Sequence, residues 1–158
     1  MKELLKYLRH YIKESILAPL FKMLEASFEL FVPLVMAAII DTGIKNSDKP
    51  YIFKMAMVLV GLAIVGFISA LTAQYFAAKA SVGFGKELRG DLYRHINTLS
   101  YSEIDKIGTS TLITRLTADV NQMQTAVNLF LRLFLRSPFI VIGAVVMAFT
   151  VDPKTAII

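Results

Sequence analysis

The chain has 158 residues, of which 56% are hydrophobic and 18% are charged. Soluble domains carry about 25% charged residues, so this balance favours a protein that lies in lipid. The chain has no cysteine, which excludes disulfides, thiol catalysis and cysteine metal sites. The formal net charge of +5 comes without any nucleic-acid-binding motif. We therefore expect no nucleic-acid partner and assign the basic excess to cytoplasmic segments.

Residues 2–13 are predicted to form a basic amphipathic helix. Apolar residues recur there at a spacing of three to four, with lysines and an arginine on other faces. A helix of this kind directly before an apolar run is typical of the headgroup plane of a membrane. The alternative is an ordinary surface helix of a soluble bundle.

Three apolar segments are long enough to cross a bilayer, which takes about 20 helical residues. They are 15–40, 55–78 and about 126–151, and the second has no charged residue at all. Asp152-Pro153 predicts a turn, after which 155–158 begins a fourth span. We expect a chain that ends inside an apolar segment to be the front part of a longer protein.

Lysines and arginines gather on one side of these spans. Four lie before the first span and eight lie in segment 79–136, whereas the 41–54 loop holds three and the last turn holds Lys154. The positive-inside rule then predicts a cytoplasmic N-terminus and a cytoplasmic 79–136 segment. A multi-pass protein of the plasma membrane is expected.

The cytoplasmic segment has the pattern of two long helices joined by a short one. Apolar residues repeat at i+3 or i+4 on both sides, which predicts that the second span continues to about residue 98 and that the third helix runs over 109–151. Between them, Ser100 and Glu103 fit a capping box, and Gly108 fits a helix C′ position. We predict a helix over 101–107, with Thr109 or Ser110 capping the next helix. The alternative is an irregular turn.

These segments carry a resemblance to a known family. The stretch Leu99-Ser-Tyr-Ser-Glu-Ile-Asp-Lys-Ile-Gly108, followed by Leu112-Ile-Thr-Arg-Leu-Thr-Ala-Asp-Val120, resembles the first intracellular loop of exporter-type (type IV) ABC transporters. The stretch Ala18-Pro-Leu-Phe-Lys-Met-Leu-Glu25, Pro33 and Ile39-Ile-Asp-Thr-Gly43 are similar to bacterial half-transporters. The resemblance covers essentially the whole chain. It implies an all-α membrane fold with an N-terminal elbow helix, three long transmembrane helices with cytoplasmic extensions, and a short coupling helix.

The resemblance also implies a function. The family unit has six spans and a C-terminal nucleotide-binding domain, and this chain lacks the second half and that domain. ATP and Mg are expected in the missing domain, with no cofactor in this chain, and a second half-transporter is expected to complete a homodimer or heterodimer. The parent would be an ATP-hydrolysing translocase that exports a drug, lipid or peptide. The glycines of Gly61–Gly66 and Gly83–Gly85 lack the residues that a phosphate-binding loop needs, so no ATPase site is predicted here.

By the same resemblance, the 101–107 helix would dock on the nucleotide-binding domain. Its packing anchors would be Tyr101, Ile104 and Ile107, and its polar rim would be Glu103, Asp105 and Lys106. The alternative is that these residues only cap and solvate the tip.

Charges inside the first span are the second candidate site. Lys22, Glu25 and Glu29 share one helix face, and Lys22 can pair with Glu25. Charged residues in spans are costly and usually face protein or a watery cavity, which makes these residues and Gln74 candidate cavity residues. The alternatives are an internal ion pair, snorkelling toward the surface, and, for Gln74, a hydrogen bond between helices.

A stripe of small residues follows one face of the second span and its extension. Its members are Gly66, Ala70, Ala73, Ala77 and Ser81. Such a stripe predicts close packing of a neighbouring helix.

Two other classes of membrane protein share some of these features. A membrane signalling or scaffold protein also uses helical stalks, but its stalks would lead on into a further domain rather than turn back. A channel or small-solute carrier rarely has a long helical hairpin between two spans.

Overall fold

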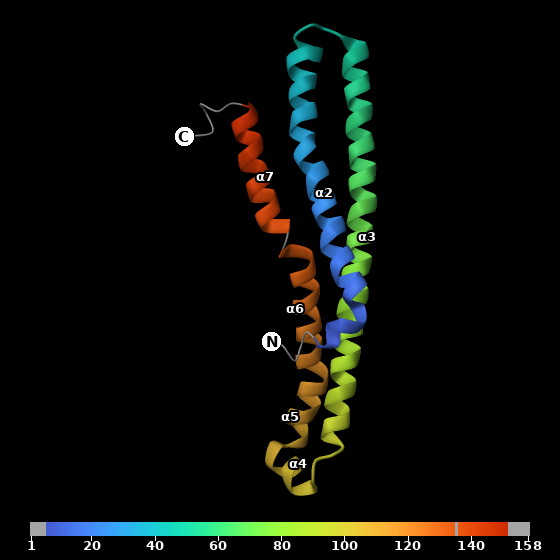
Figure 1. Ribbon diagram of the computed structural model, residues 1–158, viewed down its shortest axis with the longest axis vertical. Coiled ribbons are helices and arrows are strands. Elements are labelled where there is room, and N and C mark those ends of the chain that lie inside the picture. The colour runs from blue at the N-terminus through green and yellow to red at the C-terminus, as the bar shows by residue number, and fades with distance from the viewer. Residues whose placement is uncertain (1–5, 135, 152–158) are drawn as a thin grey trace.

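The computed structural model describes residues 6–134 and 136–151, and within these it contains helices and no strands. The helices follow one another as an up-and-down arrangement (Figure 1). In chain order they are η1 (Arg9–Tyr11), α2 (Ile12–Ala38), η2 (Ile39–Ile44), α3 (Lys49–Ile96), α4 (Tyr101–Ile107), α5 (Thr109–Thr114), η3 (Arg115–Asp119), α6 (Val120–Leu133) and α7 (Arg136–Val151).

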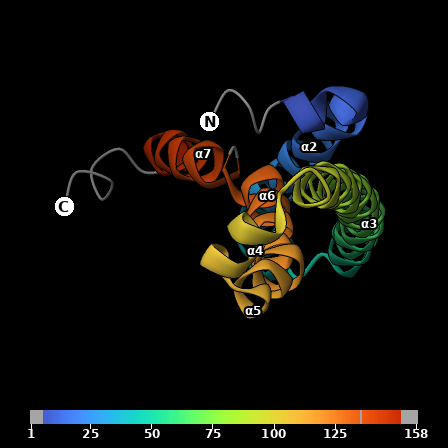
Figure 2. The ribbon, with the colours of Figure 1, turned by 90° about the horizontal axis from the view of Figure 1, so that it is seen from below.

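Three helical stretches are long and apolar enough to cross a membrane. They are Lys6–Ile44, Lys49–Ile96 and Thr109–Ala148, with mean hydropathy 1.9, 2.4 and 2.0 in their most apolar windows. The predicted all-α membrane fold is therefore confirmed in its class. Viewed from below, α6 lies between α7 and α3, and α4 lies beside α5 at the near end (Figure 2).

The predicted loop at 41–54 is wrong in its extent. The π-helical turn η2 carries the first helix on to Ile44, and α3 already begins at Lys49. Asp48 caps α3, since its carboxylate accepts a hydrogen bond of 3.1 Å from the backbone N–H of Tyr51. A capped helix with Pro50 in its first turn can start close to its predecessor, which shortens the connection.

The N-terminal elbow is described from residue 6 onward, and residues 2–5 of the predicted helix lie outside the described range. Tyr11 has φ −119° and ψ 31°, a local departure from helical geometry that separates η1 from α2. The elbow packs on α3: the ring of Tyr11 lies against Gly83, and the ring of Tyr7 meets Phe84 edge-on at 6.1 Å. A side chain at position 83 would collide with Tyr11, which explains the glycine.

Small residues allow α2 and α3 to lie close together, as the stripe predicts. Ala73, Ala77 and Ser81 are almost fully buried, while Gly66 and Ala70 are half-buried. Ala18 of α2 joins Ala77 in one buried cluster that Leu131 of α6 also enters. The packed centre of the described chain is thus built mainly of alanine, and most larger apolar side chains lie on its outside.

Polar contacts join α3 to the returning helix on the side of the tip. The guanidinium of Arg89 donates from Nε to the carbonyl of Leu116 at 3.2 Å and from Nη2 to Oδ1 of Asn121 at 2.9 Å. Leu116 lies in the π-helical turn η3, where the regular i−4 hydrogen-bond pattern is interrupted. The side chain of Gln124 lies against Gly85. The two halves of the hairpin are therefore joined by side chains along their length.

The predicted continuous helix over 109–151 is interrupted. It is π-helical over η3, α6 ends at Leu133, and α7 begins at Arg136 (Figure 1). Pro138, in the first turn of α7, favours the second interruption. Proline has no N–H to donate to the carbonyl four residues earlier, and its ring collides with that carbonyl, which here belongs to Phe134.

Candidate functional site

The tip helix α4 is present at the predicted residues and carries the predicted caps. The Ser100 Oγ accepts from the Glu103 backbone N–H at 3.4 Å, and the Glu103 carboxylate accepts from the Ser100 backbone N–H at 2.8 Å and its hydroxyl at 2.7 Å. Gly108 closes the helix with φ +86°, a value that favours glycine. The alternative of an irregular turn is thereby excluded.

The start of the helix after α4 differs from the prediction. Gly108 itself occupies the N-cap position of α5, without a side-chain cap, and Thr109 is the first helical residue. The same glycine therefore ends one helix and begins the next. Its backbone conformation turns the chain without an intervening loop, which leaves no N-cap position for Thr109 or Ser110.

The proposed docking residues lie on the outside of the tip. Tyr101 is 89% exposed and Ile107 is 36% exposed, whereas Ile104 is half-buried. The side chains of Asp105 and Lys106 are also exposed. Large apolar side chains at the end of a hairpin, beside a charged rim, form a surface suited to another protein.

The capping box should make the ionisation of Glu103 depend on Ser100. Hydrogen bonds from the Ser100 side chain and backbone stabilise the carboxylate and lower the pKa of Glu103 from its ordinary value of 4.5. The contribution of this hydrogen-bonded carboxylate to the stability of the folded protein is therefore complete above the unfolded-state pKa of Glu103. It is lost as the pH falls through the lower, folded-state pKa. We expect an NMR titration of a labelled Glu103 carboxyl to show a midpoint below the ordinary value.

The matched variant for this titration is Ser100→Ala, which removes the hydroxyl donor. It should raise the Glu103 midpoint toward the ordinary value. Equal Glu103 midpoints in the two proteins would show that the capping box does not control this carboxylate.

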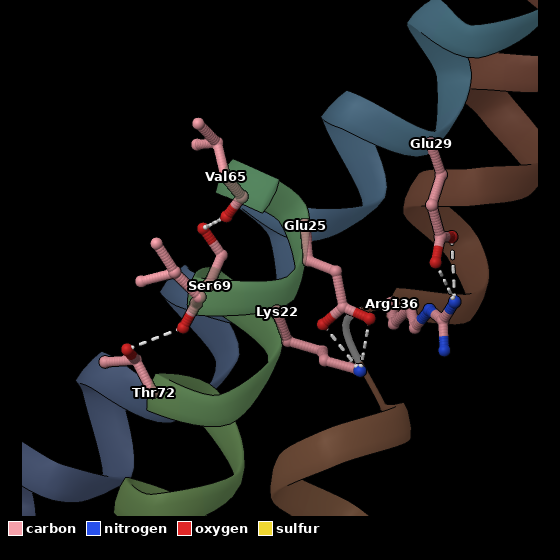
Figure 3. A network of polar contacts seen from close by, with 8 residues as sticks. Lys22, Glu25, Glu29, Val65, Ser69, Thr72 and Arg136 are labelled. Atoms are coloured by element: carbon pink, nitrogen blue, oxygen red, sulfur yellow. Dashed lines mark hydrogen bonds and ion pairs between the residues drawn. The ribbon is translucent and has the colours of Figure 1, made fainter. Parts of the chain in front are cut away.

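The charges of the first span form two separate ion pairs. Lys22 Nζ contacts the carboxylate oxygens of Glu25 at 2.6 and 2.8 Å, and both residues are buried (Figure 3). This is the internal pair that the sequence offered as one alternative. A buried lysine and glutamate in direct contact neutralise one another, which lowers the cost of placing either in an apolar setting.

Glu29 pairs with a residue that sequence reasoning did not assign to the site. The Nη2 of Arg136, at the start of α7, contacts the two carboxylate oxygens of Glu29 at 2.8 and 2.9 Å (Figure 3). These side chains are 27% and 48% exposed, respectively. In the sequence, the signal that could have pointed to Arg136 is its place as the last charged residue before an uncharged run. The pair ties the first helix to the upper part of the third.

Two of the four candidate cavity residues line a hollow. Glu25 and Glu29 border a pocket of about 230 Å³ between α2 and α3, together with Phe28 and Phe67. Lys22 and Gln74 are not among its lining residues, and Gln74 is exposed on α3. Among the described residues, no group of three histidine or acidic side chains could hold a metal ion.

Three membrane-length helices, paired charges within them and a helical hairpin define a multi-pass helical membrane protein. Residues 15–158 match the family described as the ABC transporter transmembrane region. The chain belongs to this family.

Similar proteins agree with this assignment. The chain is 32% identical over 154 residues to the uncharacterized ABC transporter ATP-binding protein YfiB of Bacillus subtilis, covering 98% of this chain and 27% of that protein. It is 29% identical to the uncharacterized ABC transporter ATP-binding protein Mb1304c of Mycobacterium bovis, covering 90% of this chain and 25% of that protein. It is 26% identical to a putative export ATP-binding/permease protein of Rickettsia felis, covering 97% of this chain and 27% of that protein. The chain thus spans about a quarter of the length of these relatives.

Proposed function

We propose that this chain is the membrane-spanning front part of an ATP-driven exporter. The observation that carries the proposal is α4, a capped helix that presents an exposed Tyr101 at the tip of two long helices. In this role α4 docks on a nucleotide-binding domain and transmits its movement to the spans. Family membership and the export name of the Rickettsia felis relative support the direction and the class of activity.

The helices around α4 are suited to transmit force. The stalk is helical on both sides, and Arg89 ties the outgoing helix to the returning one through Leu116 and Asn121. A displacement of α4 would therefore move α3 and the α5–α6 segment together, because helices packed and bonded in this way shift as a unit.

The partners and the setting follow from this proposal. ATP and Mg are bound by a nucleotide-binding domain outside this chain, and a second half-transporter completes the working dimer. The chain lies in the plasma membrane with its N-terminus and α4 on the cytoplasmic side, as its lysine and arginine distribution indicates. The transported substrate is a drug-like amphiphile, a lipid or a peptide. No observation favours the alternative of a signalling or scaffold protein, since the stalk turns at α4 and returns toward the spans.

The test is a Tyr101→Ala variant of the complete protein. Aromatic anchors at the centre of an interface contribute about 2 kcal/mol or more, so docking of the nucleotide-binding domain should weaken. We expect the ATPase rate to fall while the affinity for ATP stays unchanged, because the nucleotide site itself is not altered.

The control for this test is Ser102→Ala on the same exposed helix. This variant should keep the wild-type ATPase rate. If Tyr101→Ala hydrolyses ATP as fast as Ser102→Ala, the proposed coupling role of α4 is wrong.

A further inference from the structure

A groove lies between α3 and the start of the returning helix, away from both candidate sites. It has a volume of about 660 Å³ and is bordered by Val82, Lys86, Arg89 and Tyr93 of α3 and by Leu116 and Thr117 of η3. The four α3 residues follow at spacings of four, three and four, so they share one helix face. The volume lies within the range of about 300–1,000 Å³ that small-molecule sites occupy.

The charge of the groove is entirely positive. None of its lining residues is acidic. In the described part of the chain, Lys86 is exposed and makes no hydrogen bond or ion pair. Arg89 is held in place by its bonds to Leu116 and Asn121, which use Nε and Nη2 and leave Nη1 for a ligand. Two cations, one of them pre-positioned, therefore face the same space.

Apolar surface adjoins these cations. Val82 and Tyr93 are 55% and 59% exposed, and Leu116 is half-buried. Val82 lies one turn nearer the membrane span than Lys86. A ligand with an anionic group and an apolar part would match this arrangement, since the anion contacts the cations and the apolar part covers the side chains.

The elbow packs on α3 directly beside the groove. Tyr11 contacts Gly83, Tyr7 contacts Phe84, and Glu14 pairs with Lys79 at 2.9 Å. The basic amphipathic elbow is expected in the headgroup plane. Lys86 lies three residues beyond Gly83 on the same helix, a rise of about 5 Å. With the elbow in the headgroup plane, Lys86 would lie at the depth of the lipid phosphates.

We propose that this groove binds an anionic phospholipid, with its phosphate between Lys86 and Arg89 and its apolar part directed past Val82 toward the bilayer. The site rests on the cytoplasmic orientation given under the proposed function, where the leaflet surface is rich in anionic lipid. It does not rest on ATP hydrolysis or on export.

The test measures binding of phosphatidylglycerol and of phosphatidylcholine to the complete protein in detergent, by native mass spectrometry. The variant is Lys86→Gln, because Lys86 makes no contact that the fold needs, whereas Arg89 does. The matched control is Lys54→Gln, which removes an exposed lysine from the other end of α3. A cation near a lipid surface contributes about 1 kcal/mol, which corresponds to a change of about fivefold in affinity.

The proposal expects wild type to prefer phosphatidylglycerol, Lys86→Gln to lose about fivefold of that affinity, and Lys54→Gln to bind as wild type does. Equal binding by Lys86→Gln and wild type overturns it, and so does an equal loss in both variants. Displacement of the lipid by millimolar inorganic phosphate also overturns it, because the ligand would then be a free anion. This experiment measures lipid binding and not ATP hydrolysis. If Tyr101→Ala keeps the wild-type ATPase rate while the protein still prefers phosphatidylglycerol, only the coupling role of α4 is refuted.

Discussion

A Glu29→Leu variant should lose about 2.5–3.5 kcal/mol of unfolding free energy, the cost of leaving a charged residue unpaired within a span. In the native protein, both carboxylate oxygens of Glu29 contact Nη2 of Arg136. Removing the carboxylate leaves the Arg136 cation in an apolar setting without this partner. The measurement is SDS-induced unfolding in mixed micelles, followed by circular dichroism.

The double variant Glu29→Leu/Arg136→Leu distinguishes the loss of the ion pair from the cost of leaving one charge unpaired. It should recover most of the stability, because replacing an ion pair by apolar side chains is often neutral, whereas leaving one charge unpaired is not. Asp41→Leu is the matched control: its pair with Lys45 is more than 60% exposed on both sides and should contribute about 0–1 kcal/mol. A single Glu29 variant as stable as the double variant would contradict this role of the pair.

An Ala77→Leu variant should lose about 1–3 kcal/mol of unfolding free energy through overpacking. Ala77 is fully buried in the cluster with Ala18 and Leu131, where α2, α3 and α6 approach one another. Three added carbon atoms cannot be accommodated there unless the helices separate. The same SDS-unfolding measurement detects the loss.

The control is Ala56→Leu, an identical change on the exposed part of α3. It should leave the stability within about 0.5 kcal/mol of wild type, as exposed substitutions usually do. If the two leucine variants unfold alike, the alanine-rich interface does not set the spacing of the helices.

The sequence predicts the helices of this chain well because their causes are local. Apolar periodicity marks the three long helices, and the reciprocal side-chain and backbone bonds of Ser100 and Glu103 mark α4. The small-residue stripe predicts the buried face of α3 for the same reason, since bulk and spacing are properties of one segment. The two π-helical turns give no such local signal, and neither Ile39–Ile44 nor Arg115–Asp119 was predicted.

Most of the structural features that the sequence did not predict are contacts between distant segments. The Lys22–Glu25 pair lies within one helix and follows from its i, i+3 spacing. The Glu29–Arg136 pair joins residues 107 positions apart, and only the packing of α7 on α2 brings them together. The same holds for Arg89, whose partners Leu116 and Asn121 lie on the returning helix. The break before Arg136 could have been expected from Pro138, which sequence reasoning overlooked.

Coupling through α4 is tested most directly by a disulfide between α4 and a nucleotide-binding domain. A Tyr101→Cys variant, made in a complete protein whose other cysteines are replaced, places its thiol at an exposed position of α4. It is combined with single cysteines placed over the surface of the nucleotide-binding domain. We expect rapid oxidative cross-linking at one confined patch of that domain, with cross-link yield changing when ATP is added. Cross-links at no position, or equally at all positions, would contradict docking by α4.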